Sequence, residues 1–227
     1  MDKRLDRLAL LLGDAKVASL KDKTVLVCGL GGVGGTALES LARSGIGSFL
    51  IVDFDYVEIS NLNRQILFVE SDIGKLKVSA ALQRLQAISK DIHVETFPTH
   101  VDGSLFSQLK NTKIDFVIDA IDSPLAKQEL IEFCLTNNIP FISSSGMANR
   151  LDPTALRLGN LEETAGDPLA KKMRMLFRKS GVELSKIPVV FSKEKPIASG
   201  PTLASIMNVP SAAGLAMSSY CLEILLK

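Results

Sequence analysis

TVLVCGLGGVG, residues Thr24–Gly34, is the stretch of sequence that decides the fold. The apolar run Thr24–Cys28 has the composition of a buried strand, and an amphipathic helix is expected after the turn, over Thr36–Arg43. Between them stands GLGGVG, Gly29–Gly34, a G-x-G-x-x-G pattern in the strand–turn–helix context that the pattern requires. Glycines are needed there because the backbone turns tightly and a phosphate or ribose approaches it closely. The stretch therefore predicts a nucleotide site; the alternative is a turn that serves only strand–helix packing.

Strand and helix patterns alternate along most of the chain. They predict a Rossmann-like, doubly wound α/β fold, with a mostly parallel sheet and helices on both faces. Further strands are expected at Ser48–Val52, Ile92–Thr96, Asp115–Asp119, Pro140–Ser143, Ala155–Leu158 and Ile187–Phe191. Further helices are expected at Leu76–Ile88, at Leu125–Thr136, after the cap pair Asp167–Pro168 and at Pro210–Leu226, with an extended loop at Lys193–Val209. We expect one domain over residues 1–227, divided into an N-terminal helical arm (1–23), a nucleotide-binding core (24–150) and a C-terminal extension on the substrate side (151–227).

Composition narrows the class of protein. A length of 227 residues with 46% hydrophobic content is enough for one well-buried domain. No segment reaches about 18 uninterrupted apolar residues, so no membrane span is expected. Cys28, Cys134 and Cys221 stand far apart in apolar runs, which predicts free buried thiols, and the absence of CxxC pairs argues against a structural zinc. A reducing, cytoplasmic setting fits this cysteine usage best.

Polar residues after the second strand select the nucleotide. Asp53 ends that strand, where a carboxylate accepts hydrogen bonds from ribose hydroxyls, and with this residue alone NAD and ATP are both open. Arg64 and Lys77 add cations for a longer phosphate chain, which favours ATP. The alternative for Lys77 taken alone is a solvated surface lysine. Asn61 and Gln65 belong to the same polar stretch, which is too polar for a core and too short for a linker.

Two acidic residues close the sequence DFVIDAID. Asp122 stands just past the end of a strand, at the edge where doubly wound sheets bind their ligands, and Asp119 ends that strand. One carboxylate at this edge is expected to hold Mg²⁺ on ATP phosphates, because Mg²⁺ takes one or two carboxylates plus phosphate oxygens. The alternative for Asp122 is a cap for the helix that begins at Pro124, a role that Ser123 fills more naturally.

In order along the chain, these elements resemble the ubiquitin-activating (E1-like, ThiF-type) adenylating superfamily. The matching elements are GLGGVG, D-x-D at Asp53/Asp55, S-N-L-x-R-Q at Ser60–Gln65, G-x-x-K at Gly74–Lys77 and D-x-x-D at Asp119–Asp122. The resemblance implies ATP-dependent adenylation of a carboxylate, with pyrophosphate as the leaving group.

The resemblance also implies the roles of particular residues. Nucleotide binding would fall to Gly29, Gly31, Gly34, Asp53, Asp55, Asn61, Arg64, Gln65 and Lys77. Arg64, Lys77 and Asp122 would be catalytic, with Asp122 on the magnesium ion. Such enzymes are typically homodimers in which an N-terminal arginine enters the partner's ATP site, and Arg7 is the best match for it, ahead of Arg4.

Three later segments resemble the tRNA threonylcarbamoyladenosine dehydratases within that superfamily: SSSGMANRLDPT (Ser143–Thr154), GDPLAKKMR (Gly166–Arg174) and VVFSKEKP (Val189–Pro196). The implied reaction adenylates the threonyl carboxylate of a modified tRNA adenosine and closes a ring with release of AMP. Between Asp167 and Lys195 eight cationic residues outnumber three acidic ones, so this region is a candidate tRNA contact, with a solvated basic face as the alternative. The eight are Lys171, Lys172, Arg174, Arg178, Lys179, Lys186, Lys193 and Lys195.

Three other functions stay open. The first is adenylation of the C-terminus of a ubiquitin-like or sulfur-carrier protein, which is weakened because sulfur-carrier activators usually have zinc-binding CxxC pairs and a loop cysteine that this chain lacks. The second is an NAD-dependent oxidoreductase, which fits Asp53 but gives Arg64 and Lys77 no role. The third is a catalytically silent module that senses nucleotide or binds tRNA.

Overall fold

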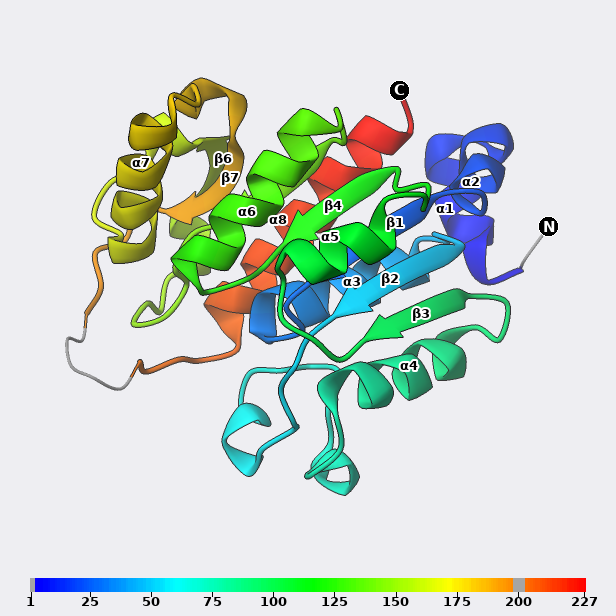
Figure 1. The fold of residues 1–227 in the computed structure, drawn as a ribbon. Helices are drawn as coiled ribbons and strands as arrows, with labels where there is room; N and C mark the ends of the chain where they lie inside the picture. The colour runs from blue at the N-terminus through cyan, green and yellow to red at the C-terminus, as the bar shows by residue number, and fades with distance from the viewer. Residues whose placement is uncertain (1–2, 198–202) are drawn as a thin grey trace.

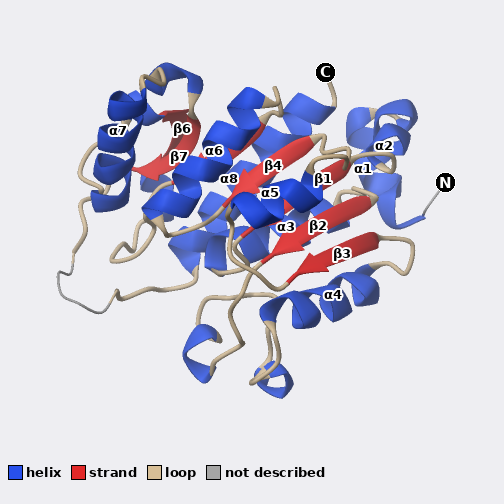
Figure 2. Ribbon diagram, viewed as in Figure 1, coloured by secondary structure: helices blue, strands red, loops and turns tan. Residues whose placement is uncertain are grey.

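The computed structural model describes residues 3–197 and 203–227, which form a seven-stranded sheet in the order β3-β2-β1-β4-β5-β7-β6 (Figures 1 and 2). The strands are β1 (Thr24–Cys28), β2 (Ser48–Val52), β3 (His93–Phe97), β4 (Phe116–Asp119), β5 (Phe141–Ser144), β6 (Leu156–Asn160) and β7 (Pro188–Ser192). All neighbouring pairs are parallel except β6 and β7, so β6 is an antiparallel edge strand. The predicted doubly wound α/β class is confirmed.

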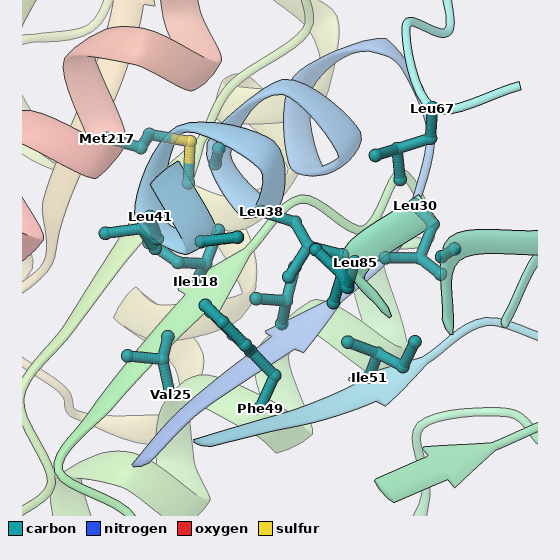
Figure 3. Close-up of a cluster of buried hydrophobic side chains, with 14 of the residues drawn as sticks. Val25, Leu30, Leu38, Leu41, Phe49, Ile51, Leu67, Leu85, Ile118 and Met217 are labelled. Atoms are coloured by element: carbon teal, nitrogen blue, oxygen red, sulfur yellow. The ribbon is translucent and has the colours of Figure 1, made fainter. Parts of the chain in front are cut away.

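Helices cover both faces of this sheet. The helices of the described residues are α1 (Asp6–Leu12), α2 (Asp14–Leu20), α3 (Gly32–Arg43), α4 (Lys77–Ile88), α5 (Gly103–Leu109), α6 (Pro124–Thr136), α7 (Pro168–Ser180) and α8 (Asn208–Leu225), of which α3 to α8 cover the faces. One hydrophobic cluster joins α3, α4 and α8 to one face, and a second joins α5, α6 and α7 to the other. In the first cluster, Leu38 and Leu41 of α3 lie over Val25, Phe49 and Ile51 of the strands (Figure 3).

The order of the strands fixes where a ligand can bind. The chain runs from β1 outward through β2 to β3, and then crosses back to β4 on the other side of β1. The connections after β1 and β4 therefore leave the sheet in opposite directions, which opens a crevice at the carboxyl ends of these two strands. The glycine turn follows β1 and the DAID turn follows β4, so both border this crevice.

The N-terminal arm, α1 and α2, packs at the opposite, amino end of the strands (Figure 1). Arg4 donates hydrogen bonds to the carbonyl oxygen of Ile88 and to Ser89 Oγ (2.6 Å), and Leu5 lies beside Gly45. Leu10 and Leu11 of α1 are 89% and 78% exposed. The arm thus leaves an apolar surface uncovered within one chain.

Several element boundaries differ from the sequence prediction. Helix α3 begins at Gly32 and not at Thr36, because the glycine-rich stretch itself forms the first helical turn. Helix α5 was not predicted, although Asp102 caps it by accepting hydrogen bonds from the amides of Ser104 and Leu105. Ser123 stands at the N-cap position of α6 but its side chain makes no capping bond, which corrects that expectation.

The C-terminal part follows the expected order of elements. Asp167 caps α7 by accepting a hydrogen bond from the amide of Ala170, as predicted. The closing helix α8 begins two residues earlier than expected, at Asn208. Of the expected loop Lys193–Val209, residues 198–202 lie outside the described part of the chain. Among the described residues, no helix has the length and apolar character that crossing a membrane would require.

Candidate nucleotide-binding and catalytic site

The glycines of the turn after β1 have different structural roles. Gly29 has φ +87°, and a Cβ there would lie 2.7 Å from the carbonyl oxygen of Ala120. A Cβ on Gly34 would lie 1.9 Å from the carbonyl oxygen of Gly29, so packing alone requires both glycines. A Cβ on Gly31 would meet nothing closer than Gln65 Nε2 at 3.9 Å. Gly31 therefore leaves open space beside the N-terminus of α3, where first-turn N–H groups have no acceptor within the helix and favour an anion.

Asp53 is fixed at the end of β2 by the glycine turn itself. Its Oδ2 accepts a hydrogen bond from the amide of Leu30 (2.7 Å), and its Oδ1 accepts one from the amide of Asp55 (2.9 Å). Burial raises the pKa of this carboxyl, while Lys77 and the two amides partly offset the effect. Hydrogen bonds thus join the strand end, the glycine turn and the acidic pair into one unit.

Lys77 is the first residue of α4 and points into the same unit. Its Nζ lies 2.7 Å from Asp55 Oδ2 and 4.0 Å from Asp53 Oδ1. The lysine is only 5% exposed, whereas the Asp55 side chain is 47% exposed. The structure therefore rules out the alternative of a solvated surface lysine. It places a buried cation on the acidic pair that anchors the glycine turn, with a partner, Asp55, that solvent can reach.

The NLNRQ stretch borders the glycine turn from the other side. Asn61 is buried and serves its own turn, because its Oδ1 accepts a hydrogen bond from the amide of Glu58 (3.1 Å). Gln65 is also buried, and its Oε1 has no hydrogen-bond partner in the described structure. Arg64 is half-buried and donates to the carbonyl oxygen of Ser60 (2.7 Å). The stretch thus offers a half-buried cation and, next to Gly31, an unused buried acceptor.

The D-x-x-D motif splits into one buried and one exposed carboxylate. Asp119 is fully buried and pairs with Lys127 of α6, whose Nζ lies 2.7 Å from Asp119 Oδ2. Asp122 is exposed and makes no hydrogen bond or ion pair with the described residues. Sequence reasoning missed Lys127, because a lysine within a helix ordinarily indicates a solvated face.

A second group of residues forms hydrogen bonds with the segment around Ala204. This segment precedes α8 and runs back toward the site. Asn149, with φ +61°, exchanges two hydrogen bonds with Ala204 and accepts one from the amide of Ile197 (2.8 Å). Asn63 Nδ2 donates to the carbonyl oxygen of Ser205 (3.0 Å). The segment around Ala204 therefore lies beside the NLNRQ stretch. In the sequence, nothing pointed to Asn149 individually; only the SSSGMANRLDPT segment that contains it was noted as a whole.

Neither the cysteines nor the same chain's Arg7 belong to this crevice as reactive groups. Cys28, Cys134 and Cys221 are free and buried, as predicted, and burial raises the pKa of each thiol. Arg7 is exposed on α1, at the amino end of the strands. The structure brings together the predicted site residues of the core but leaves Arg7 at the opposite edge.

The basic residues of the C-terminal extension are mostly free in solvent. Arg174 donates to the carbonyl oxygen and the hydroxyl of Thr164, and Lys186 pairs with Glu183 at 2.9 Å. The exposed remainder comprises Lys171, Lys172, Arg178, Lys179, Lys193 and Lys195. Lys193 and Lys195 follow the carboxyl end of β7, so they lie on the sheet edge that also carries the crevice.

Comparison with known proteins places this arrangement in a family. The family model described as "ThiF family" matches residues 5–226. The chain belongs to the ThiF family. Among the relatives of this ThiF chain is the tRNA threonylcarbamoyladenosine dehydratase of Bacillus subtilis, 36% identical over 242 residues, an alignment that covers 99% of this chain and 95% of that protein. The enzyme of the same name from Escherichia coli is 36% identical over 166 residues, which cover 73% of this chain and 62% of the relative.

A solved structure agrees with the sequence relatives. The E. coli tRNA N6-threonylcarbamoyladenosine dehydratase TcdA, in complex with ATP, matches with a TM-score of 0.93 and 31% identity over 98% of this chain and 93% of that one. The similarity extends over the sheet, the N-terminal arm and the C-terminal extension, so this ThiF chain shares the architecture of that protein as a whole.

Proposed function

We propose that this protein is an ATP-dependent dehydratase that adenylates the threonyl carboxylate of N6-threonylcarbamoyladenosine in tRNA and promotes its cyclisation. The observation that carries the proposal is the meeting, at one crevice, of the open space at Gly31, the Asp53–Lys77 unit and the Asp122 carboxylate, which has no partner among the described residues. Relatives and a solved structure that carry the dehydratase name, matched over nearly the whole chain, support this substrate.

The nucleotide has a specific place in this proposal. Asp53 accepts hydrogen bonds from the ribose, and the phosphates cross Gly31 toward the N–H groups at the start of α3. Lys77 then shares its ammonium between Asp55 and a phosphate, because Asp55 is exposed enough to be solvated in its place. Arg64 adds a second cation from the surface, and Gln65 supplies the buried acceptor that has no partner among the described residues.

Magnesium fits the donor set of this edge. The described residues contain no group of three or more His, Cys, Asp or Glu side chains that could hold a metal, so they form no complete protein cage. Mg²⁺ does not need one, because it binds through one or two carboxylates and substrate phosphates and keeps its waters. Asp122 is the carboxylate that would hold it, and the bound ion would neutralise charge on the phosphates.

The chemistry needs no protein nucleophile. An oxygen of the threonyl carboxylate attacks the α-phosphorus of ATP, the bond to the bridging oxygen breaks and pyrophosphate leaves. Lys77 and Arg64 stabilise the charge that develops on the phosphorus oxygens. A neighbouring group of the same side chain then attacks the activated carbonyl carbon, AMP leaves with the carboxylate oxygen and a proton is released. The nucleoside thus loses one water, and proximity within one side chain favours the second step.

The proposal extends to assembly, tRNA and setting. A homodimer explains the exposed Leu10 and Leu11, and it would carry Arg7 of one chain to the ATP site of the other. The exposed cations of α7 and of the β7 edge would bind tRNA phosphates. Three buried free thiols suit a reducing, cytoplasmic setting.

The test is incubation of the protein with ATP, Mg²⁺ and tRNA that carries threonylcarbamoyladenosine, followed by mass analysis of the nucleosides. We expect a nucleoside lighter by one water and an equal amount of AMP. Asp122→Ala should abolish both products while the circular dichroism spectrum and melting temperature stay unchanged. Pyrophosphate exchange that needs a carrier protein and not tRNA, or tighter binding of NADH than of ATP, would contradict the proposal.

A further inference from the structure

Lys127 is a buried cation that the chemistry above does not use. Its side chain is 1% exposed, and its Nζ donates to Asp119 Oδ2 (2.7 Å), to Ser143 Oγ (3.0 Å) and to the carbonyl oxygen of Asp119 (3.5 Å). Ser143 Oγ in turn donates to Asp119 Oδ2 (2.7 Å). These three residues, the Lys127 network, join α6, β4 and β5 in the core beneath the crevice. All three donors of the ammonium are used.

A buried ion pair contributes little net free energy to the stability of a core. Both charges lose their water, and apolar side chains of similar volume often give equal or greater stability. A buried pair therefore invites a search for what it holds in place. The second carboxylate oxygen of Asp119 shows what this pair holds in place. Asp119 Oδ1 accepts a hydrogen bond from the amide of Ile121 (3.2 Å).

Ile121 belongs to the short turn that carries Asp122. The turn is held on its far side by the glycine loop, since the Cα of Gly29 packs so closely on Ala120 that a Cβ there would lie 2.7 Å from its carbonyl oxygen. The turn is thus fixed between the Lys127 network and the nucleotide cradle, by which we mean the glycine turn with Asp53 and Lys77. Asp122 makes no hydrogen bond or ion pair with the described residues, so its carboxylate is held only through the backbone of this turn.

We propose that Lys127 is a positioning residue that acts through Asp119 and the amide of Ile121 to hold the Asp122 carboxylate against the nucleotide cradle. This inference rests on the proposed function, because it assigns to Asp122 the magnesium ion of ATP. Lys127 also neutralises Asp119, so that, as far as the described residues go, Asp122 is the carboxylate of the motif without a paired cation.

The experiment measures the affinity for ATP by calorimetry, with Mg²⁺ and with EDTA, in the absence of tRNA. The quantity of interest is the gain in affinity that Mg²⁺ produces. Lys127→Met should reduce this gain by ~10-fold or more, as is typical when a group that supports a metal ligand is removed. Binding of ATP in EDTA should change less than twofold.

Two further variants separate positioning from general loosening of the fold. Arg150→Met removes the cation of another buried pair, Arg150–Asp167 at 3.4 Å, and should lower the melting temperature but keep the magnesium gain. The double variant Asp119→Leu with Lys127→Met removes both buried charges, so it should recover stability and still lack the gain. It also covers the case in which Lys127→Met alone fails to fold.

The outcomes are distinguishable. A double variant that keeps the full magnesium gain, or a loss of the gain in Arg150→Met as well, would overturn the positioning role. If the unaltered protein forms product from tRNA, and Asp122→Ala abolishes it, the proposed function stands even when the positioning role fails. A parent protein with no magnesium gain and no tRNA product would overturn both.

Discussion

Replacing Gly31 by alanine separates the requirements of folding from those of nucleotide binding. The added Cβ would be in ordinary contact with Gln65 Nε2, at 3.9 Å, and Gly31 has φ −71°, which alanine adopts without strain. We therefore expect Gly31→Ala to cost no more than about 1 kcal/mol of folding free energy, mainly because alanine is a poorer N-cap than glycine. The methyl group would occupy the space where the phosphates cross the turn, and ATP affinity should fall by about 10- to 100-fold, or roughly 1.4 to 2.7 kcal/mol.

Two control variants, Gly34→Ala and Gly103→Ala, are expected to give the two opposite extremes with which Gly31→Ala is compared. A Cβ on Gly34 lies 1.9 Å from the carbonyl oxygen of Gly29, so the backbones would have to separate by about 1.5 Å to reach ordinary contact, and we expect both stability and binding to be lost. A Cβ on Gly103 meets nothing within 4 Å, so Gly103→Ala should change neither. Thermal unfolding and ATP calorimetry measure both quantities on each variant. If Gly31→Ala binds ATP within twofold of the parent, the phosphates do not cross Gly31 and the site is wrongly placed.

Three further predictions concern other parts of the molecule. Burial alone would raise the pKa of Glu39, but its arginine partners, Arg84 foremost, lower it, so Glu39→Gln should lower the free energy of unfolding at pH 7 by ~1–3 kcal/mol. Because the folded pKa is the lower one, that difference should shrink in denaturant melts as the pH falls below about 4 and disappear below the folded pKa. If Arg7 acts in the partner's site, mixing the inactive variants Arg7→Ala and Asp122→Ala should restore about one quarter of the turnover, and no recovery would place Arg7 elsewhere. Lys171→Glu should weaken tRNA binding and reduce the salt slope by about 1, whereas an unchanged slope in filter-binding assays would remove this lysine from the tRNA surface.

The strands, and the edge of the sheet at which the predicted site residues lie, were predictable because their signals are local. Strands such as Thr24–Cys28 and Ser48–Val52 are buried on both faces of a parallel sheet, and this burial is what requires their continuous apolar runs. Asp53 and Asp122 follow strand ends, and carboxyl ends of parallel strands meet at one edge. That Asp53 and Asp122 lie at the same edge of the sheet therefore followed from the order of the elements alone.

Other features depend on tertiary contacts that no local pattern contains. Lys127 and Glu39 resemble surface charges in the sequence, and only the packing of α6 on β4, and of α3 beside Arg84, buries them with partners. The role of Asn149 depends on a residue 55 positions later, Ala204. Helix α5 is seven residues long, too short for its periodicity to stand out.

The two ends of the sheet bear on the proposal that a complete site needs two chains. The arm that carries Arg7 packs at the amino end, while Asp53 and Asp122 stand at the carboxyl end of strands such as β1 and β2. A five-residue strand is about 17 Å long, so Arg7 cannot reach its own crevice unless the arm leaves the contacts that Arg4 and Leu5 make. If the arm stays packed, the proposed homodimer would instead cover its exposed leucines with another copy. Dilution below the dimer dissociation constant should therefore reduce turnover per chain without unfolding the sheet, and turnover independent of concentration would show that one chain suffices.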